Sequence, residues 1–129
     1  MFDKYLIDAT SVRNITTDGV VNGFEFAVRI GYYRGLAISM VEPFDVVVDG
    51  VAIDGSEIRF TVAGQTFTYE EMETRADVRW EMVDDAIITV LRPGGLAPGE
   101  HTIDLTEHLR VSYLPFIPAH HDNKVVTVG

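Results

Sequence analysis

The sequence predicts an all-β domain built as an antiparallel sandwich of two sheets, and two observations carry this prediction. Apolar and polar residues alternate along several segments, and turn residues separate these segments at short intervals. The segments are also rich in β-branched and aromatic residues, which suit the pleated surface of a sheet. Because each segment has one apolar face, two sheets that cover each other's apolar sides explain the pattern, as in jelly-roll or immunoglobulin-like sandwiches.

The alternation assigns one face of each segment to the core. Trp80 lies in a segment where apolar residues also recur at every second position, so we expect it to pack in the core as well. The expected inward positions are Phe24, Phe26, Val28 and Ile30, then Phe44, Val46 and Val48, then Ile58, Phe60 and Val62, and later Ile87, Thr89, Leu91, Ile103 and Leu105.

Turns and one helical segment complete the predicted architecture. Asp18-Gly19, Asp49-Gly50 and Asp54-Gly55 supply residues that tolerate positive φ, and Ala63-Gly64-Gln65 is expected to close another hairpin. The segment Tyr69–Arg75 is expected to form a single helical turn at the surface. No linker, repeat or low-complexity tract divides residues 1–129, so the sequence predicts a single domain.

Composition and charge exclude several functional classes. The chain has 129 residues and a net charge of −10, which disfavours binding to a nucleic-acid backbone. It contains no cysteine, so disulfides, thiolate metal sites and a cysteine nucleophile are excluded. Apolar stretches such as Ala86–Leu91 fall far short of the ~20 residues that span a membrane. With no secretory signal in sight, the expected location is the cytoplasm.

Histidine is the residue type with which a catalytic or metal site would be expected to start. His101 follows Glu100 at the entry to a predicted strand, where a structural role is expected. His120-His121-Asp122 is expected to lie in a polar surface loop, and adjacent residues of an extended chain point to opposite faces. No His-x-His pair, serine elbow or phosphate-binding loop is present, so we expect neither a catalytic residue nor a metal site in this chain.

Two segments have the composition of a contact surface with another protein. The first, residues 31–35, places two tyrosines and an arginine between glycines, and these residue types are enriched in interface hot spots. The second, residues 113–118, is apolar, but its two prolines prevent pairing as a central strand. The candidate interface or pocket-lining residues are Tyr32, Tyr33, Arg34, Leu114, Phe116 and Ile117.

The order and spacing of several segments carry a family resemblance. These segments are Gly31-Tyr32-Tyr33-Arg34-Gly35, Ser39-Met40-Val41-Glu42, Val46-Val47-Val48-Asp49-Gly50, Ile58-Arg59-Phe60-Thr61-Val62, Tyr69-Glu70-Glu71-Met72, Arg79-Trp80, Pro93-Gly94-Gly95-Leu96-Ala97-Pro98-Gly99-Glu100-His101 and Leu109-Arg110-Val111-Ser112-Tyr113-Leu114-Pro115. Together they resemble the small β subunit of bacterial C-glycoside deglycosidases, from about Tyr5 to Phe116.

This resemblance implies that the chain is an accessory subunit of a carbon–carbon lyase complex and is not active alone. In that family the partner is a larger α subunit, a TIM barrel that holds a divalent metal such as Mn²⁺. The complex cleaves the bond between a sugar and the aromatic carbon of its aglycone in 3-oxo-C-glucosides, including flavonoid C-glycosides. The metal polarises a carbonyl and a base removes a proton, and the resemblance places both in the α subunit.

Two other readings remain open from the residues alone. A non-catalytic carbohydrate-binding or adhesion module is also commonly built on a β-sandwich, although such modules usually carry a secretion signal. An independent metal enzyme would have to use Glu100, His101, His120 or His121, and its purified chain would retain an ion.

Overall fold

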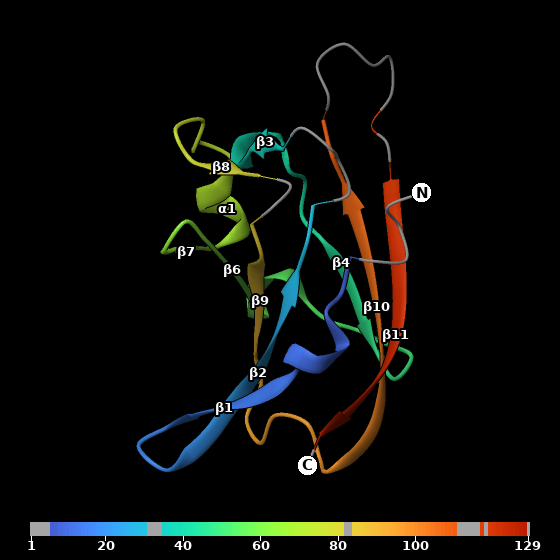
Figure 1. Cartoon of the computed structure of the whole chain (residues 1–129). Helices are drawn as coiled ribbons and strands as arrows, with labels where there is room; N and C mark the ends of the chain where they lie inside the picture. Colours follow the sequence, from blue (N-terminus) through green and yellow to red (C-terminus); the bar gives the residue numbers. More distant parts are fainter. Residues whose placement is uncertain (1–5, 31–34, 82–83, 111–116, 118, 129) are drawn as a thin grey trace.

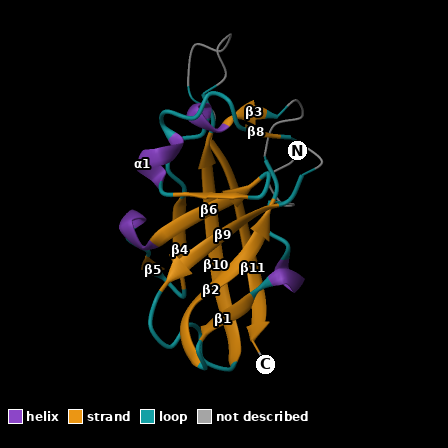
Figure 2. Ribbon diagram, turned by 90° about the vertical axis from the view of Figure 1, so that its left-hand side faces the viewer, coloured by secondary structure: helices purple, strands orange, loops and turns teal. Residues whose placement is uncertain are grey.

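The computed structural model describes residues 6–30, 35–81, 84–110, 117 and 119–128, and it shows a β-sandwich (Figures 1 and 2). The first sheet has five antiparallel strands in the order β1-β2-β9-β6-β7, and the second has four in the order β11-β10-β4-β5. A third, two-stranded sheet of β3 and β8 lies at one end, beyond the two layers predicted from the sequence. The predicted all-β fold is confirmed.

The strands of the first sheet are β1 (Arg13–Thr17), β2 (Val20–Val28), β9 (Ala86–Leu91), β6 (Ile58–Val62) and β7 (Gln65–Phe67). Those of the second sheet are β11 (Ala119–Val128), β10 (Gly99–His108), β4 (Asp45–Val48) and β5 (Val51–Ala52). The small sheet pairs β3 (Leu36–Ala37) with β8 (Arg79–Trp80). Short helical segments are η2 (Ala9–Ser11), η3 (Ile38–Met40), η4 (Gly55–Glu57) and α1 (Tyr69–Met72).

Tight hairpin turns follow the predicted pairs in three cases. Asp18-Gly19, Asp49-Gly50 and Ala63-Gly64 all have positive φ at both residues, which matches the right-handed twist of the strands they connect. The prediction of a positive-φ turn at Asp54-Gly55 is wrong. Asp54 has φ −66° and caps η4, because its carboxylate accepts hydrogen bonds from the backbone and hydroxyl of Ser56.

The space between the two large sheets is filled by one hydrophobic core. Phe24, Phe26 and Phe60 are fully buried, and burial of each such side chain contributes about 1.5–3 kcal/mol. Trp80 is also fully buried, as predicted, and its ring contacts Phe60 with centroids 5.1 Å apart. The core therefore extends from the sheets to the end of the sandwich that β3 and β8 cover.

One predicted strand face is wrong. In β9, Ala86, Ile88 and Val90 are the buried residues, whereas Ile87, Thr89 and Leu91 face outward. Both faces of β9 are apolar, so alternation alone does not choose between them. The choice follows from register: Ile88 pairs with Phe26 of β2 on one side and with Phe60 of β6 on the other, so all three side chains share one face.

The predicted helical turn is confirmed, and it is anchored at both ends. Thr68 and Glu71 form a capping box, in which the Thr68 side chain accepts from the Glu71 backbone and the Glu71 side chain accepts from the Thr68 backbone. Met72 at the end of α1 is buried in the core. Within the described residues, no helix is both long and apolar enough to cross a membrane.

Candidate functional site

The residues predicted to form an interface mostly lie outside the part of the chain that the structure describes. Tyr32, Tyr33, Arg34, Leu114 and Phe116 are all in this group, so their role stays a prediction. The sixth predicted residue, Ile117, lies just before β11 and is 48% exposed.

Residues just before the second predicted segment contact the chain that follows β3, a few residues after the first predicted segment. The backbone of Arg110 donates to Met40 O at 2.7 Å, and its guanidinium donates to Ser39 O at 2.9 Å and pairs with Glu42 at 3.4 Å. Val41 forms an isolated β-bridge with Leu109. The chain leaving β3 and the chain leaving β10 are therefore fastened to each other.

His101 has the structural role that the sequence predicts. Its Nδ1 lies 2.6 Å from Asp49 Oδ2 and its Nε2 lies 2.7 Å from Ala97 O, so both ring nitrogens are engaged. Asp49 also accepts from the backbone N–H of Thr102. The hydrogen bond with Asp49 raises the pKa of His101, and the same bond lowers the pKa of Asp49. The pair fixes the β4–β5 turn against the start of β10.

The prediction of a surface loop at His120-His121-Asp122 is wrong, because these residues lie in β11. Strand geometry does separate the two histidines: His121 faces solvent, where its Nε2 lies 3.2 Å from Asp104 Oδ1, while His120 faces the other way. Pairing of all ten β11 residues with β10 overrides the low strand propensity of this polar sequence. Among the described residues, no three His, Asp or Glu side chains are placed to hold a metal ion.

Asp122 is a buried polar residue that the sequence pattern did not reveal. Its residue surface is 3% exposed, and its carboxylate accepts from the backbone N–H of Ile7 at 2.8 Å and from Lys124 Nζ at 2.6 and 2.8 Å. Ile7 in turn bridges to Val28 of β2. Asp122 therefore ties the N-terminal segment and the first sheet to β11 of the second sheet.

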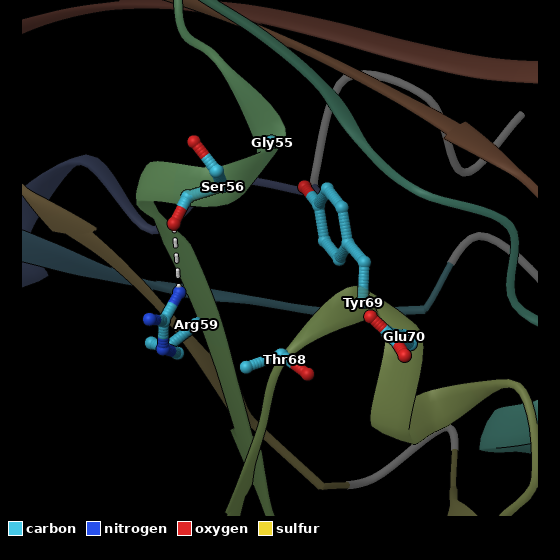
Figure 3. A pocket seen from close by; sticks show the side chains of 6 residues that line it. All are labelled: Gly55, Ser56, Arg59, Thr68, Tyr69 and Glu70. Carbon is cyan, nitrogen blue, oxygen red and sulfur yellow. Dashed lines mark hydrogen bonds between the residues drawn. The ribbon is translucent and has the colours of Figure 1, made fainter.

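A cavity of about 360 Å³ lies between η4 and the start of α1 (Figure 3). Gly55 and Ser56 of η4 line one side, Arg59 of β6 lies beside them, and the start of α1 forms the opposite side with Tyr69. Thr68 and Glu70 complete the lining.

The wall of this cavity is rigid on the tyrosine side. The phenol of Tyr69 donates to Phe44 O at 3.1 Å, and its ring packs against Gly55 so closely that a Cβ there would lie 3.1 Å from a ring carbon. Burial raises the pKa of the Tyr69 phenol above its usual value, so this hydroxyl remains a hydrogen-bond donor at neutral pH.

Arg59 differs from every other described lysine or arginine in its surroundings. Its Nη1 donates to two backbone carbonyls, those of Ser56 at 3.0 Å and Ile58 at 2.9 Å, and none of the described carboxylates forms an ion pair with it. The nearby Glu57 pairs with Arg92 at 3.6 Å instead. The described cations that do pair with a carboxylate are Arg13, Arg29, Arg75, Arg79, Arg92, Arg110 and Lys124.

Comparison with known proteins identifies the family. The sequence model of the C-glycoside deglycosidase beta subunit family matches residues 2–113. The chain belongs to this family. It is 34% identical over 114 residues to a C-glycoside deglycosidase beta subunit of Eubacterium cellulosolvens, covering 88% of this chain and 78% of that protein. It is also 36% identical over 107 residues to a 3'-dehydrocarminate deglycosidase beta subunit of a Microbacterium species, covering 80% of each. The resemblance drawn from the sequence is confirmed.

The residues of the cavity and the buried carboxylate that the sequence analysis missed differ in whether the local sequence carries a signal for them. The pattern Thr68-x-x-Glu71 is a readable capping box, and it marks the start of α1 beside the cavity. From the sequence, Arg59 is recognisable only as an outward-facing residue of an alternating strand. Asp122 is recognisable only as one of several polar residues in its segment. Neither the cavity nor the buried carboxylate has a signature in local sequence, because both depend on contacts between distant segments.

Proposed function

We propose that this chain is the accessory β subunit of a complex that cleaves the carbon–carbon bond between the sugar and the aglycone of a 3-oxo-C-glucoside. The match of the family to residues 2–113 is the observation that carries this proposal. Relatives named as beta subunits support a partner subunit, and their names as C-glycoside and 3'-dehydrocarminate deglycosidases support the proposed substrate class. A cysteine-free chain suits a reducing compartment, so we place the complex in the cytoplasm.

The proposed reaction is an elimination that the sugar ketone makes possible. A 3-oxo group acidifies the neighbouring C–H bond, so a base can remove that proton. The bond from the sugar to the aglycone carbon then breaks, the aglycone carbon takes up a proton, and an unsaturated anhydro-keto sugar remains. A separate oxidoreductase supplies the 3-oxo substrate, so the elimination itself needs no oxidant.

We place the base and a divalent metal in a larger TIM-barrel α subunit. A metal such as Mn²⁺ would polarise the sugar ketone there. The described residues of the present chain support this division of labour: His101 is engaged at both ring nitrogens by Asp49 and Ala97. His120 and His121 point to opposite faces of β11, which does not suit joint binding of one ion.

We place the contact with the α subunit at the end of the sandwich where β3 and β10 emerge. The candidate contact residues remain Tyr32, Tyr33, Arg34, Leu114, Phe116 and Ile117, of which the exposed Ile117 is described. Support comes from Arg110, just after β10, which donates hydrogen bonds to Ser39 O and Met40 O in η3, just after β3. Aromatic and arginine residues are enriched in interface cores, which favours these segments as the contact surface.

The test is co-expression with the barrel-type subunit expected from a neighbouring gene. Each subunit and the mixture are assayed on a 3-oxo-C-glucoside, and we expect turnover only by the mixture, which should elute as one species in size-exclusion chromatography. Turnover by the present chain alone, or by the barrel subunit equally well without it, would contradict the proposal.

The contact surface is tested separately by alanine substitution. Tyr33→Ala and Arg34→Ala together are expected to weaken binding to the α subunit at least tenfold. Val20→Ala is the matched control, because Val20 is 65% exposed at the β1–β2 hairpin, and Figure 1 places that hairpin at the opposite end from β3. If the double variant and the control bind the α subunit with equal affinity, Tyr33 and Arg34 do not belong to the interface and the proposed contact surface is wrong.

A further inference from the structure

The cavity between η4 and α1 places a donor and an acceptor of opposite charge around one opening. Figure 3 shows Arg59 beside Ser56 on one side and Glu70 on the other, with Thr68 between them. Arg59 is held in place by two backbone carbonyls that use only its Nη1, and its other N–H groups remain for water or a ligand. Glu70 is exposed at the start of α1 and presents a carboxylate, which only accepts hydrogen bonds.

The two hydroxyl groups in the lining add complementary hydrogen-bonding capacity. Ser56 Oγ donates to Asp54 Oδ1 at 2.8 Å, so its lone pairs are left to accept. Thr68 Oγ1 accepts from the backbone of Glu71 at 3.1 Å, so its hydrogen is left to donate. The lining therefore offers both donors and acceptors, and the ring of Tyr69 supplies an apolar wall.

The charge pattern selects among ligand classes. A lone anion would be attracted by Arg59 and repelled by Glu70, and a lone cation would experience the reverse. A neutral ligand with several hydroxyl groups satisfies both, because each hydroxyl can donate to the carboxylate and accept from the guanidinium. The volume of about 360 Å³ falls in the range of ~300–1,000 Å³ that is common for small-molecule pockets.

We propose that this cavity is a binding site for a neutral polyhydroxyl ligand of the size of a single pyranose sugar. Arg59 and Glu70 hold hydroxyl groups from opposite sides, and the Tyr69 ring with Gly55 forms the apolar floor. The site belongs to this chain alone, so the proposal stands apart from the assembly with an α subunit.

The experiment is an NMR titration of the isotopically labelled full chain with methyl β-D-glucopyranoside. Saturable shifts are expected at the amides of Gly55, Ser56 and Tyr69, with a millimolar Kd. Arg59→Met is expected to weaken binding about tenfold or more, because it removes charge-assisted hydrogen bonds. Glu70→Gln, at an exposed position where folding is not at risk, is expected to weaken binding several-fold.

The controls separate this site from general effects. Glu73→Gln removes an equal charge from the end of α1 at a residue that does not line the cavity, and it should leave the Kd unchanged. A second titration uses benzoate as an anionic probe. The proposal is overturned if the glucoside causes no saturable shifts at the cavity, if Glu73→Gln weakens binding as much as Glu70→Gln, or if only benzoate binds. A failure of the co-expression assay would leave this titration unaffected.

Discussion

Replacing Asp122 by alanine tests whether the buried carboxylate holds the two sheets together. The change removes the acceptor of the buried Ile7 amide, and an unsatisfied buried donor costs about 1–3 kcal/mol. It also removes the carboxylate beside the Lys124 ammonium, and breaking a buried ion pair costs about 3–5 kcal/mol. Because the Lys124 side chain keeps 28% of its surface exposed, water recovers part of that loss.

We therefore expect Asp122→Ala to lower the free energy of unfolding by about 3 kcal/mol, which corresponds to a fall in Tm of roughly 10 °C for a chain of this length. Urea denaturation followed by fluorescence measures the loss, since Trp80 is the only tryptophan and is fully buried. Asp104→Ala is the matched control: Asp104 lies outward on β10, and its exposed contacts with His121 and with the Asn123 amide are each worth at most about 1 kcal/mol. A loss below about 1 kcal/mol for Asp122→Ala, or one equal to that of the control, would refute the reasoning.

Three further predictions follow from the same structure. Because the folded pKa of His101 is raised, its contribution to stability is complete below the unfolded value of 6.5 and is lost as pH rises through the folded value. Because the folded pKa of Asp49 is lowered, its contribution is complete above 3.8 and is lost as pH falls. Urea midpoints of the wild type should thus decrease as pH rises above 6.5, those of His101→Gln should decrease less over the same range, and parallel curves would disprove this. Gly23→Ala in β2 should lower the free energy of unfolding by about 1–3 kcal/mol, because the added Cβ would clash with the Val90 carbonyl of β9. An unchanged Tm would show that β2 and β9 can move apart to admit the methyl group without loss of stability. Thr68→Ala should cost about 1 kcal/mol in urea through loss of the helix cap, and Thr68→Ser should restore most of it.

The success of the strand predictions depended on how different the two faces of each strand are. In β6, apolar Ile58, Phe60 and Val62 alternate with polar Arg59 and Thr61, and the predicted face is the buried one. In β9 both faces carry aliphatic side chains, so the sequence offered no basis for the choice that pairing with β2 and β6 makes.

β11 shows the opposite case, in which a strand forms against its own composition. Its first half reads His120-His121-Asp122-Asn123, a run of residues with low strand propensity. Tertiary contacts stabilise this strand: it forms ten cross-strand pairs with β10, and Asp122 accepts a hydrogen bond from Ile7. Such contacts join residues that are far apart in the sequence. Local sequence patterns do not report them, so the sequence analysis predicted neither this strand nor the cavity beside Arg59.

The hydrogen bond between Ile7 and Asp122 also bears on how the chain reaches its folded state. The two residues are 115 positions apart, so a very long loop of chain must close before this bond can form. Contacts of such large sequence separation slow folding, and the β-rich topology adds further non-local pairings. The hairpins at Asp18-Gly19 and Ala63-Gly64 join neighbouring strands, so we expect them to form earlier than the docking of Ile7 against β11.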